Sequence, residues 1–177
     1  MGNKDYGANT FYSDKYDDQF EHVRKYYTAV QAETKGFVHF RPAVYWNRTE
    51  DSFELFRDSP QKTPYNYHQT DVYGLHLNNY FSTRWGKTAF GAEMRHENIV
   101  STNLGESLEV SKDISGAETR YTHGLNRTHI SFHLEHNLLL PRLTLSAGVI
   151  AVKNSGNGMK FRFYPGVDVG FRLTRDW

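Results

Sequence analysis

Four histidines and a glutamate are the side chains of this sequence that most resemble metal ligands. His129, His133 and Glu135 are spaced by even numbers of residues, so they would lie on the same face of a strand, and His76 would lie one or two strands away in a sheet. His133 and His136 are three residues apart and point to opposite faces of a strand, so they are not a chelating pair. Polar groups on a wet face explain the same pattern, and we predict no metal site.

Catalytic motifs are missing from the sequence. Serine, histidine and aspartate all occur, but there is no nucleophile elbow, no His-Glu-x-x-His helix and no Walker loop. Residues 154–158 are a glycine-rich hairpin link without a following helix to hold a phosphate. The absence of cysteine excludes disulfides and thiol chemistry, and a net charge of +1 leaves no basic footprint for nucleic acid. We therefore expect neither an enzyme nor a nucleic-acid-binding protein.

A third group of polar side chains is spaced for charge pairing across a sheet. They recur at even spacing within two segments, which places each subset on one face of a strand. The group consists of Glu93, Arg95, Glu97, Arg162, Asp168 and Arg172. We predict that these residues pair with one another, or with groups on the strands between them, and line a hydrated interior.

The segments that carry these groups alternate apolar and polar residues with period two. In residues 87–99 the apolar row runs from Thr88 to Met94, and the opposite row carries the charges. Similar rows recur in residues 38–45, 73–81, 130–138, 143–151 and 161–173. Period two predicts strands, and these exceed the roughly 9 to 11 residues that cross a bilayer at a tilt. The sequence thus predicts an all-β antiparallel meander of about seven long amphipathic strands.

The connections between these strands differ at the two ends of the meander. Short links fall at residues 34–36, 84–86 and 141–142, whereas residues 50–66 and 101–125 form long polar connections; the short link 154–158 is the exception. Alternate connections of a meander lie at the same end, so one rim has tight turns and the other long loops. This asymmetry is typical of outer-membrane barrels.

Aromatic residues also fall near the predicted rims. Trp85 and Trp177 lie at the tight-turn rim, and Tyr26, Trp46 and Tyr67 lie near the loop rim, as interfacial girdles do. Aromatic residues are also ordinary strand formers. Two further alternatives stay open: a soluble β-sandwich or small barrel that binds an apolar ligand, and a small complete outer-membrane barrel, which needs an even strand count.

Several stretches resemble one known family. Residues 7–21, Gly-Ala-Asn-Thr-Phe-Tyr-Ser-Asp-Lys-Tyr-Asp-Asp-Gln-Phe-Glu, resemble a barrel segment of TonB-dependent outer-membrane receptors, particularly those of the cobalamin transporter type. Residues 86–102, 138–148 and 161–170 look like barrel strands of the same receptors. The resemblance implies uptake of a scarce nutrient across the outer membrane, with cobalamin as the substrate and ferric siderophores as the alternative.

The resemblance also implies what surrounds the chain. Residues 1–177 would be a single segment of a transmembrane barrel of about 22 strands, without the plug domain, the TonB box and the C-terminal strands. Such a segment alone is not expected to transport. Its partners would be the receptor's own plug, the TonB complex, outer-membrane lipid and a surface lipoprotein. Because an isolated segment has two unpaired sheet edges, we expect it to self-associate.

Calcium is the one cofactor that the resemblance suggests, because some cobalamin receptors use it to order extracellular loops. The candidate ligands are Glu50, Asp51, Glu54 and Asp58. Their spacing lacks the oxygen-rich pattern of a dedicated calcium loop, so a solvated polar loop is the competing interpretation.

Overall fold

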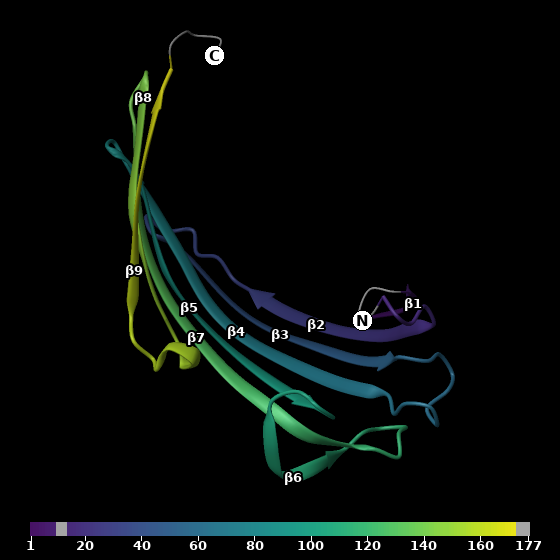
Figure 1. Cartoon of the computed structure of the whole chain (residues 1–177). Helices are drawn as coiled ribbons and strands as arrows, with labels where there is room; N and C mark the ends of the chain where they lie inside the picture. Colours follow the sequence, from purple (N-terminus) through teal and green to yellow (C-terminus); the bar gives the residue numbers. More distant parts are fainter. Residues whose placement is uncertain (10–13, 173–177) are drawn as a thin grey trace. The chain divides into compact units, whose positions relative to one another are not determined.

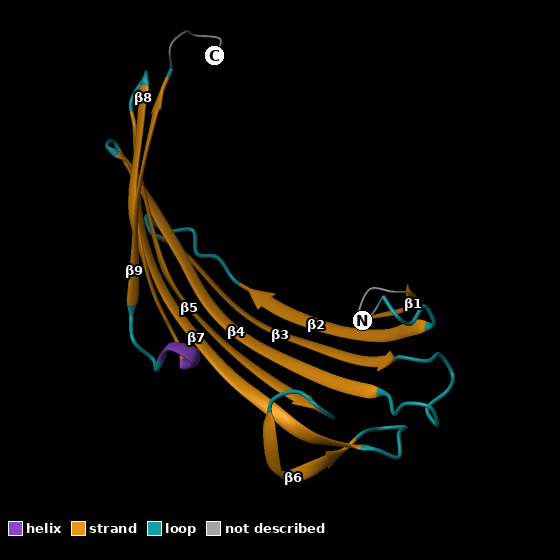
Figure 2. Cartoon of the chain, in the orientation of Figure 1, coloured by secondary structure: helices purple, strands orange, loops and turns teal. Residues whose placement is uncertain are grey.

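The structure is a computed structural model that describes residues 1–9 and 14–172. Over these residues nine strands form one antiparallel meander sheet, which is not closed into a barrel (Figures 1 and 2). The strands are β1 (Gly2–Asn9), β2 (Gln19–Gln31), β3 (His39–Glu54), β4 (Asn66–Thr83), β5 (Gly86–Ser101), β6 (Glu106–Asp113), β7 (Arg120–Leu139), β8 (Leu143–Asn154) and β9 (Arg162–Phe171). A short 3-10 helix, η1 (Ser155–Asn157), connects β8 to β9.

The predicted all-β antiparallel meander is confirmed, but the expected count of about seven strands is too low for the described residues. β1 and β6 account for the difference, and neither carries an apolar row that sequence reasoning could detect. β1 pairs with β2, and β6 pairs with the first residues of β7, off the main strand order. Both pairings contain a register irregularity.

The chain divides into two compact units, which are described separately. The first unit comprises Met1–Thr28, Trp46–Tyr73 and Glu97–Asn126, and the second comprises Ala29–Tyr45, Gly74–His96 and Arg127–Trp177. Leu173 and Trp177, which the sequence placed in the last apolar row and at the tight-turn rim, lie outside the described residues. Among the described residues no helix is both long and apolar enough to span a membrane.

The second unit has two chemically different faces, as the alternation predicts. Across β7, β8 and β9, Leu134 pairs with Val149 and Val149 with Pro165, whereas the next positions pair Glu135, Gly148 and Gly166. The rows of β4 and β5 join the apolar face through the rings of Phe81 and Phe90, whose centroids lie 6.4 Å apart. The register therefore places the predicted apolar rows together.

Many side chains of the apolar face are exposed. We term this set the apolar band; each of its members is at least 37% exposed. They are Phe40, Val44, Leu75, Leu77, Met94, Phe132, Leu134, Phe163, Val167, Val169 and Phe171. Within the described residues no second layer of secondary structure packs over the sheet to cover them.

Rings on the polar face of the second unit lie over strand glycines. The ring of Tyr45 occupies the space where Gly74 would carry a side chain, and the ring of His133 does the same above Gly91. His39 and Tyr80 stack with centroids 4.5 Å apart and planes 2° from parallel. These contacts fix adjacent strands side by side without an apolar core.

Proline at the outer edge of β9 fits the hydrogen-bond pattern of that strand. The amide of Arg172 donates to the carbonyl of Arg142 at 2.9 Å, and the pairing of β8 with β9 shows no irregularity. Even-numbered amides of β9 therefore point toward β8, and odd-numbered positions, including Pro165, point to the free edge. Because proline has no N–H, this placement costs the sheet no internal hydrogen bond.

The first unit has a small apolar core. Val100, Ile114 and Tyr121 are buried together, and the partly buried Tyr67 and Leu108 pack against them. Ile114 belongs to the link between β6 and β7, so this link folds back onto the strands. The long connection predicted at residues 101–125 is therefore a structured element that encloses part of the unit.

We predict opposite effects for two glycine substitutions on the polar face. In Gly91→Ala, the added methyl group would collide with the carbonyl oxygen of Leu77 and the ring of His133, which should destabilise the fold by about 1 to 3 kcal/mol. In Gly166→Ala, nothing lies within 4 Å, and stability should rise by up to about 1 kcal/mol. Thermal unfolding followed by circular dichroism measures both; equal melting temperatures would contradict the close packing at Gly91.

Candidate functional site

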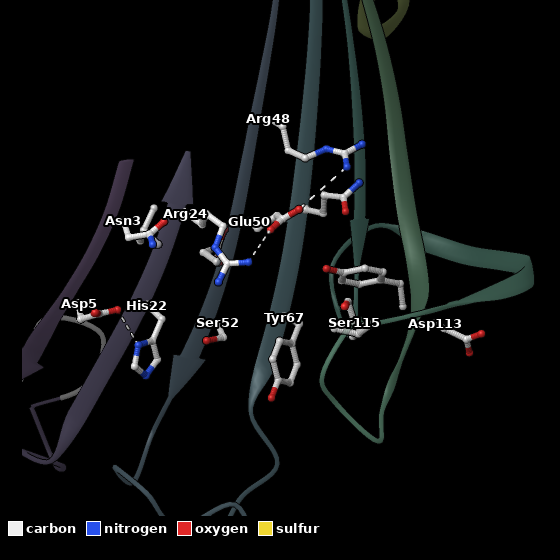
Figure 3. Close-up of a pocket in the computed structure, with 15 residues that line it drawn as sticks. Asn3, Asp5, His22, Arg24, Arg48, Glu50, Ser52, Tyr67, Asp113 and Ser115 are labelled. Atoms are coloured by element: carbon white, nitrogen blue, oxygen red, sulfur yellow. Dashed lines mark hydrogen bonds and ion pairs between the residues drawn. The ribbon is translucent and has the colours of Figure 1, made fainter. Parts of the chain in front are cut away.

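A cavity of about 530 Å³ in the first unit is the candidate site (Figure 3). Strands β1 to β4 provide most of its wall, and the end of β6, the link to β7 and the start of β7 provide the rest. We term it the charged groove. Its principal lining residues are His22, Arg24, Arg48, Glu50, Tyr67 and Tyr121. Its volume lies within the range of small-molecule sites.

Alternation along two strands directs the charged side chains into the groove. His22 and Arg24 are two residues apart on β2, and Arg48, Glu50 and Ser52 follow the same spacing on β3. Residues spaced by two share one face of a strand. Figure 3 shows these five side chains on neighbouring strands, with ion pairs joining Glu50 to both arginines.

The most extensive hydrogen-bond network of the groove wall centres on Asp71 of β4, which is 5% exposed. Arg48 donates from Nε at 2.8 Å to one carboxylate oxygen and from Nη2 at 2.9 Å to the other. Trp46 donates its indole N–H at 2.9 Å, and Gln69 donates from Nε2 at 2.9 Å. Four donors thus hold one buried carboxylate, which is the arrangement that a buried charge requires.

The network also shifts the ionisation of its members. Burial alone would raise the pKa of Asp71, but hydrogen bonds from Arg48, Trp46 and Gln69, with the charge of Arg48, outweigh burial and lower it. The hydrogen bond to Asp71 raises the pKa of Arg48. The pair is therefore ionised throughout the neutral range, and its contribution to stability is lost only as the pH falls through the lowered pKa of Asp71.

A second chain of polar contacts lies between β1 and β3. His22 contacts Asp5 through Nδ1 at 2.7 Å and Glu54 through Nε2 at 3.2 Å. Glu54 is 5% exposed and also accepts from the amide of Asp58 at 3.0 Å. This chain ties the short edge strand β1 to the end of β3.

The four predicted calcium ligands do not form a cluster. Glu50, Asp51 and Glu54 belong to β3 and not to the expected loop, because β3 continues to Glu54. Glu50 pairs with arginines, Glu54 with His22, and the exposed Asp58 with Arg57 at 3.8 Å. Among the described residues no group of three or more histidine, aspartate or glutamate side chains is arranged to hold a metal ion.

Asp51 follows Glu50 on β3 and also lines the groove, and its surroundings raise its pKa. Burial, together with the nearby charge of Glu21, raises the pKa of Asp51 to about 6. On β4, burial lowers the pKa of His68, whose Nδ1 lies 2.8 Å from the hydroxyl of Ser101. Ser101 is fully buried and accepts from the amide of Leu104, so it caps a turn and is not an accessible nucleophile.

Some members of the predicted charge network share one face of the sheet. Gly91 lies under His133, so Glu93 and Arg95 share a face with Glu135, and the register adds Asp168 to that face. Strands β7 and β8 separate β5 from β9, a spacing of about 14 Å at 4.8 Å per strand. Direct pairing between the β5 and β9 groups is therefore not formed.

The remaining members of that set differ in their surroundings. Arg162 lies on the same face of β9 as Asp168, and both are exposed. The exposed Arg172 follows the strand, with its amide bonded to Arg142. Glu97 belongs to the first unit. The predicted histidines do not meet as ligands: the ring of His133 covers Gly91, and His136 contacts Thr88 on the opposite face at 2.9 Å.

Sequence reasoning missed the Asp71 network. Trp46 and Arg48 are spaced to share a face of β3, which is a usable signal. The partner carboxylate lies 23 residues away from Arg48 on another strand, and only the register of β3 with β4 identifies it.

We predict that Asp71→Asn destabilises the first unit strongly. The substitution removes the charge of a buried carboxylate and weakens its hydrogen bonds to Arg48, whose side chain is 32% exposed and keeps Glu50 as a partner, so the cost should be about 1 to 3 kcal/mol. The matched control is Asp113→Asn, which removes the exposed carboxylate that pairs with Arg120 at 2.6 Å. Chemical denaturation at pH 7 should separate the two variants clearly; equal unfolding midpoints would refute the role of Asp71.

Comparison with known proteins adds no relative: no protein-family model, no curated protein and no solved structure matches the chain. The resemblance to TonB-dependent receptors stays a prediction from the quoted segments. The groove offers paired charges, amides and hydroxyls for binding.

Proposed function

We propose that this chain is part of the barrel of a TonB-dependent outer-membrane receptor that takes up a scarce nutrient, with cobalamin as the substrate. The observation that supports the membrane assignment most is the exposed apolar band of the second unit. The large apolar side chains of the band, on five strands, are too many for an ordinary water-facing surface, on which big contiguous apolar patches are uncommon.

Lipid is the partner that suits this band. Each large apolar side chain gains about 1.5 to 3 kcal/mol when it is fully removed from water, and a single-layer sheet has no other element to provide that burial. The face opposite to the band carries Tyr45, His76, Glu93 and Arg95, which suit a hydrated interior. One apolar and one polar row on each strand is the pattern of outer-membrane barrels.

The free edges of the sheet support a segment of something larger. Among the described strands, β1 pairs only with β2, and β9 pairs only with β8. Further barrel strands, with the plug inside and the TonB complex as the source of energy, would be the partners of these surfaces in a complete receptor. A segment with both edges open is not itself a transporter, because a barrel wall needs every strand paired.

The choice of cobalamin depends on one segment. Residues 7–21 carry the resemblance to cobalamin receptors, and their described part includes the end of β1 and the start of β2. Glu50 and Glu54, the expected calcium ligands of an extracellular loop, are engaged in ion pairs. The nutrient is therefore proposed from the resemblance alone, and calcium is not part of the proposal.

Lipid contact can be measured residue by residue, because the chain has no cysteine. We expect a fluorescent label at Leu134→Cys or Val167→Cys to be quenched strongly in vesicles of brominated phosphatidylcholine, because both positions belong to the apolar band. Labels at the neighbouring Glu135→Cys and Asp168→Cys serve as matched controls and should keep their emission. Equal emission at all four positions would exclude a lipid-facing band and favour a soluble sheet.

Membership of a larger receptor makes a separate prediction. An antibody raised against this segment should detect, in the outer-membrane fraction of native cells, a protein several times larger than the 20.6 kDa of the segment, because the plug and the remaining strands are attached. A soluble band near 20.6 kDa would contradict the receptor assignment and leave a small binding module.

A further inference from the structure

We propose that the charged groove of the first unit binds a neutral, polyhydroxylated molecule of the size of a disaccharide. The proposal does not depend on the receptor function, because it uses only residues within the first unit. A hydroxyl group both donates and accepts hydrogen bonds, so a sugar-like molecule suits a site that mixes donors and acceptors at short spacing.

The ion pairs of Glu50 with Arg24 and Arg48 leave these side chains able to form further hydrogen bonds. Glu50 lies 3.8 Å from Nη1 of Arg24 and 4.0 Å from Nη1 of Arg48. Both distances exceed that of a hydrogen bond, so the carboxylate is held between two guanidinium groups without being saturated by them. Ligand hydroxyls could donate to Glu50 and accept from Arg24 without breaking the network around Asp71.

Rigid support makes these groups a prepared site. Asp71 fixes Arg48 through two hydrogen bonds and is itself held by Trp46 and Gln69. Pre-positioned donors lose little conformational entropy when a ligand binds, which favours affinity for small polar molecules.

Aromatic residues provide the apolar part of the lining. Tyr67 and Tyr121 line the same cavity; Tyr121 is 7% exposed and belongs to the core, so the partly buried Tyr67, which Figure 3 shows near Ser52, is the ring that a ligand would contact first. Burial raises the pKa of Tyr121 to about 12, so its hydroxyl remains protonated at neutral pH. An aromatic ring can pack against the C–H groups on the face of a sugar ring. The guanidinium and carboxylate groups beside it can hydrogen-bond to the hydroxyl groups at the sugar's edge.

Charge excludes an anion as the preferred ligand. Arg24 and Arg48 are the cationic guanidinium groups of the lining, and Arg48 is already neutralised by the buried Asp71. Glu50, Asp5 and Asp113 add negative charge around the same cavity. An incoming phosphate or carboxylate would meet carboxylates as well as cations, so a neutral ligand is favoured.

The test is saturation-transfer NMR on the full chain with glucose, mannose, galactose and maltose, in an amine-oxide detergent that contains no sugar. We expect saturable binding of at least one sugar, and inorganic phosphate should not displace it. Glu50→Gln should weaken binding about tenfold, equal to roughly 1.4 kcal/mol. The matched control is Glu33→Gln in the second unit, where Glu33 pairs with Arg41 at 3.6 Å; it should leave binding unchanged.

Four outcomes would overturn the proposal. The first three are no saturable binding to any of the four sugars, displacement of the sugar by millimolar phosphate, and equal weakening by the Glu50 and Glu33 variants. Ser52→Ala is a second groove variant with an unchanged charge, and circular dichroism confirms that each variant is folded; if Ser52→Ala and Glu50→Gln both bind like the wild type, the sugar lies elsewhere.

Discussion

The pleat of the sheet is the constraint on which the structure depends. Successive side chains point to opposite faces, so the pairing of β7, β8 and β9 without irregularity puts Val149 beside Leu134 and Pro165, and Gly148 beside Glu135 and Gly166. A shift of one residue would mix the two chemistries on both faces. No second layer of the described chain covers the apolar face.

The first unit folds around few buried apolar side chains. Its core has three buried residues, Val100, Ile114 and Tyr121. Around the core, the carboxylates of Asp71 and Glu54 are each about as buried as core residues and accept several hydrogen bonds. Directional polar contacts take over part of the role of packing here, and they leave a groove where a fully apolar core would leave none.

The sequence predicted the strands whose own residues alternate between apolar and polar. The apolar rows of β4, β5, β7, β8 and β9 follow from spacing alone, and the register confirms that they share a face. Sequence reasoning failed where the signal lies between strands: β1 and β6 are strands because of their neighbours, and the partner of Arg48 depends on the offset of β3 against β4. The expected loop at Glu50 and Glu54 is instead the end of β3, which lies between β2 and β4 in the sheet.

Pro165 gives the free edge of β9 a built-in preference for certain neighbours. At this position an approaching strand finds a carbonyl acceptor but no donor, because the ring has replaced the N–H. A copy of β9 aligned so that two such prolines face each other would bring two carbonyls together without a donor between them. The edge therefore discourages stacking of identical strands in that alignment, while it still accepts a different strand whose own N–H meets the Pro165 carbonyl.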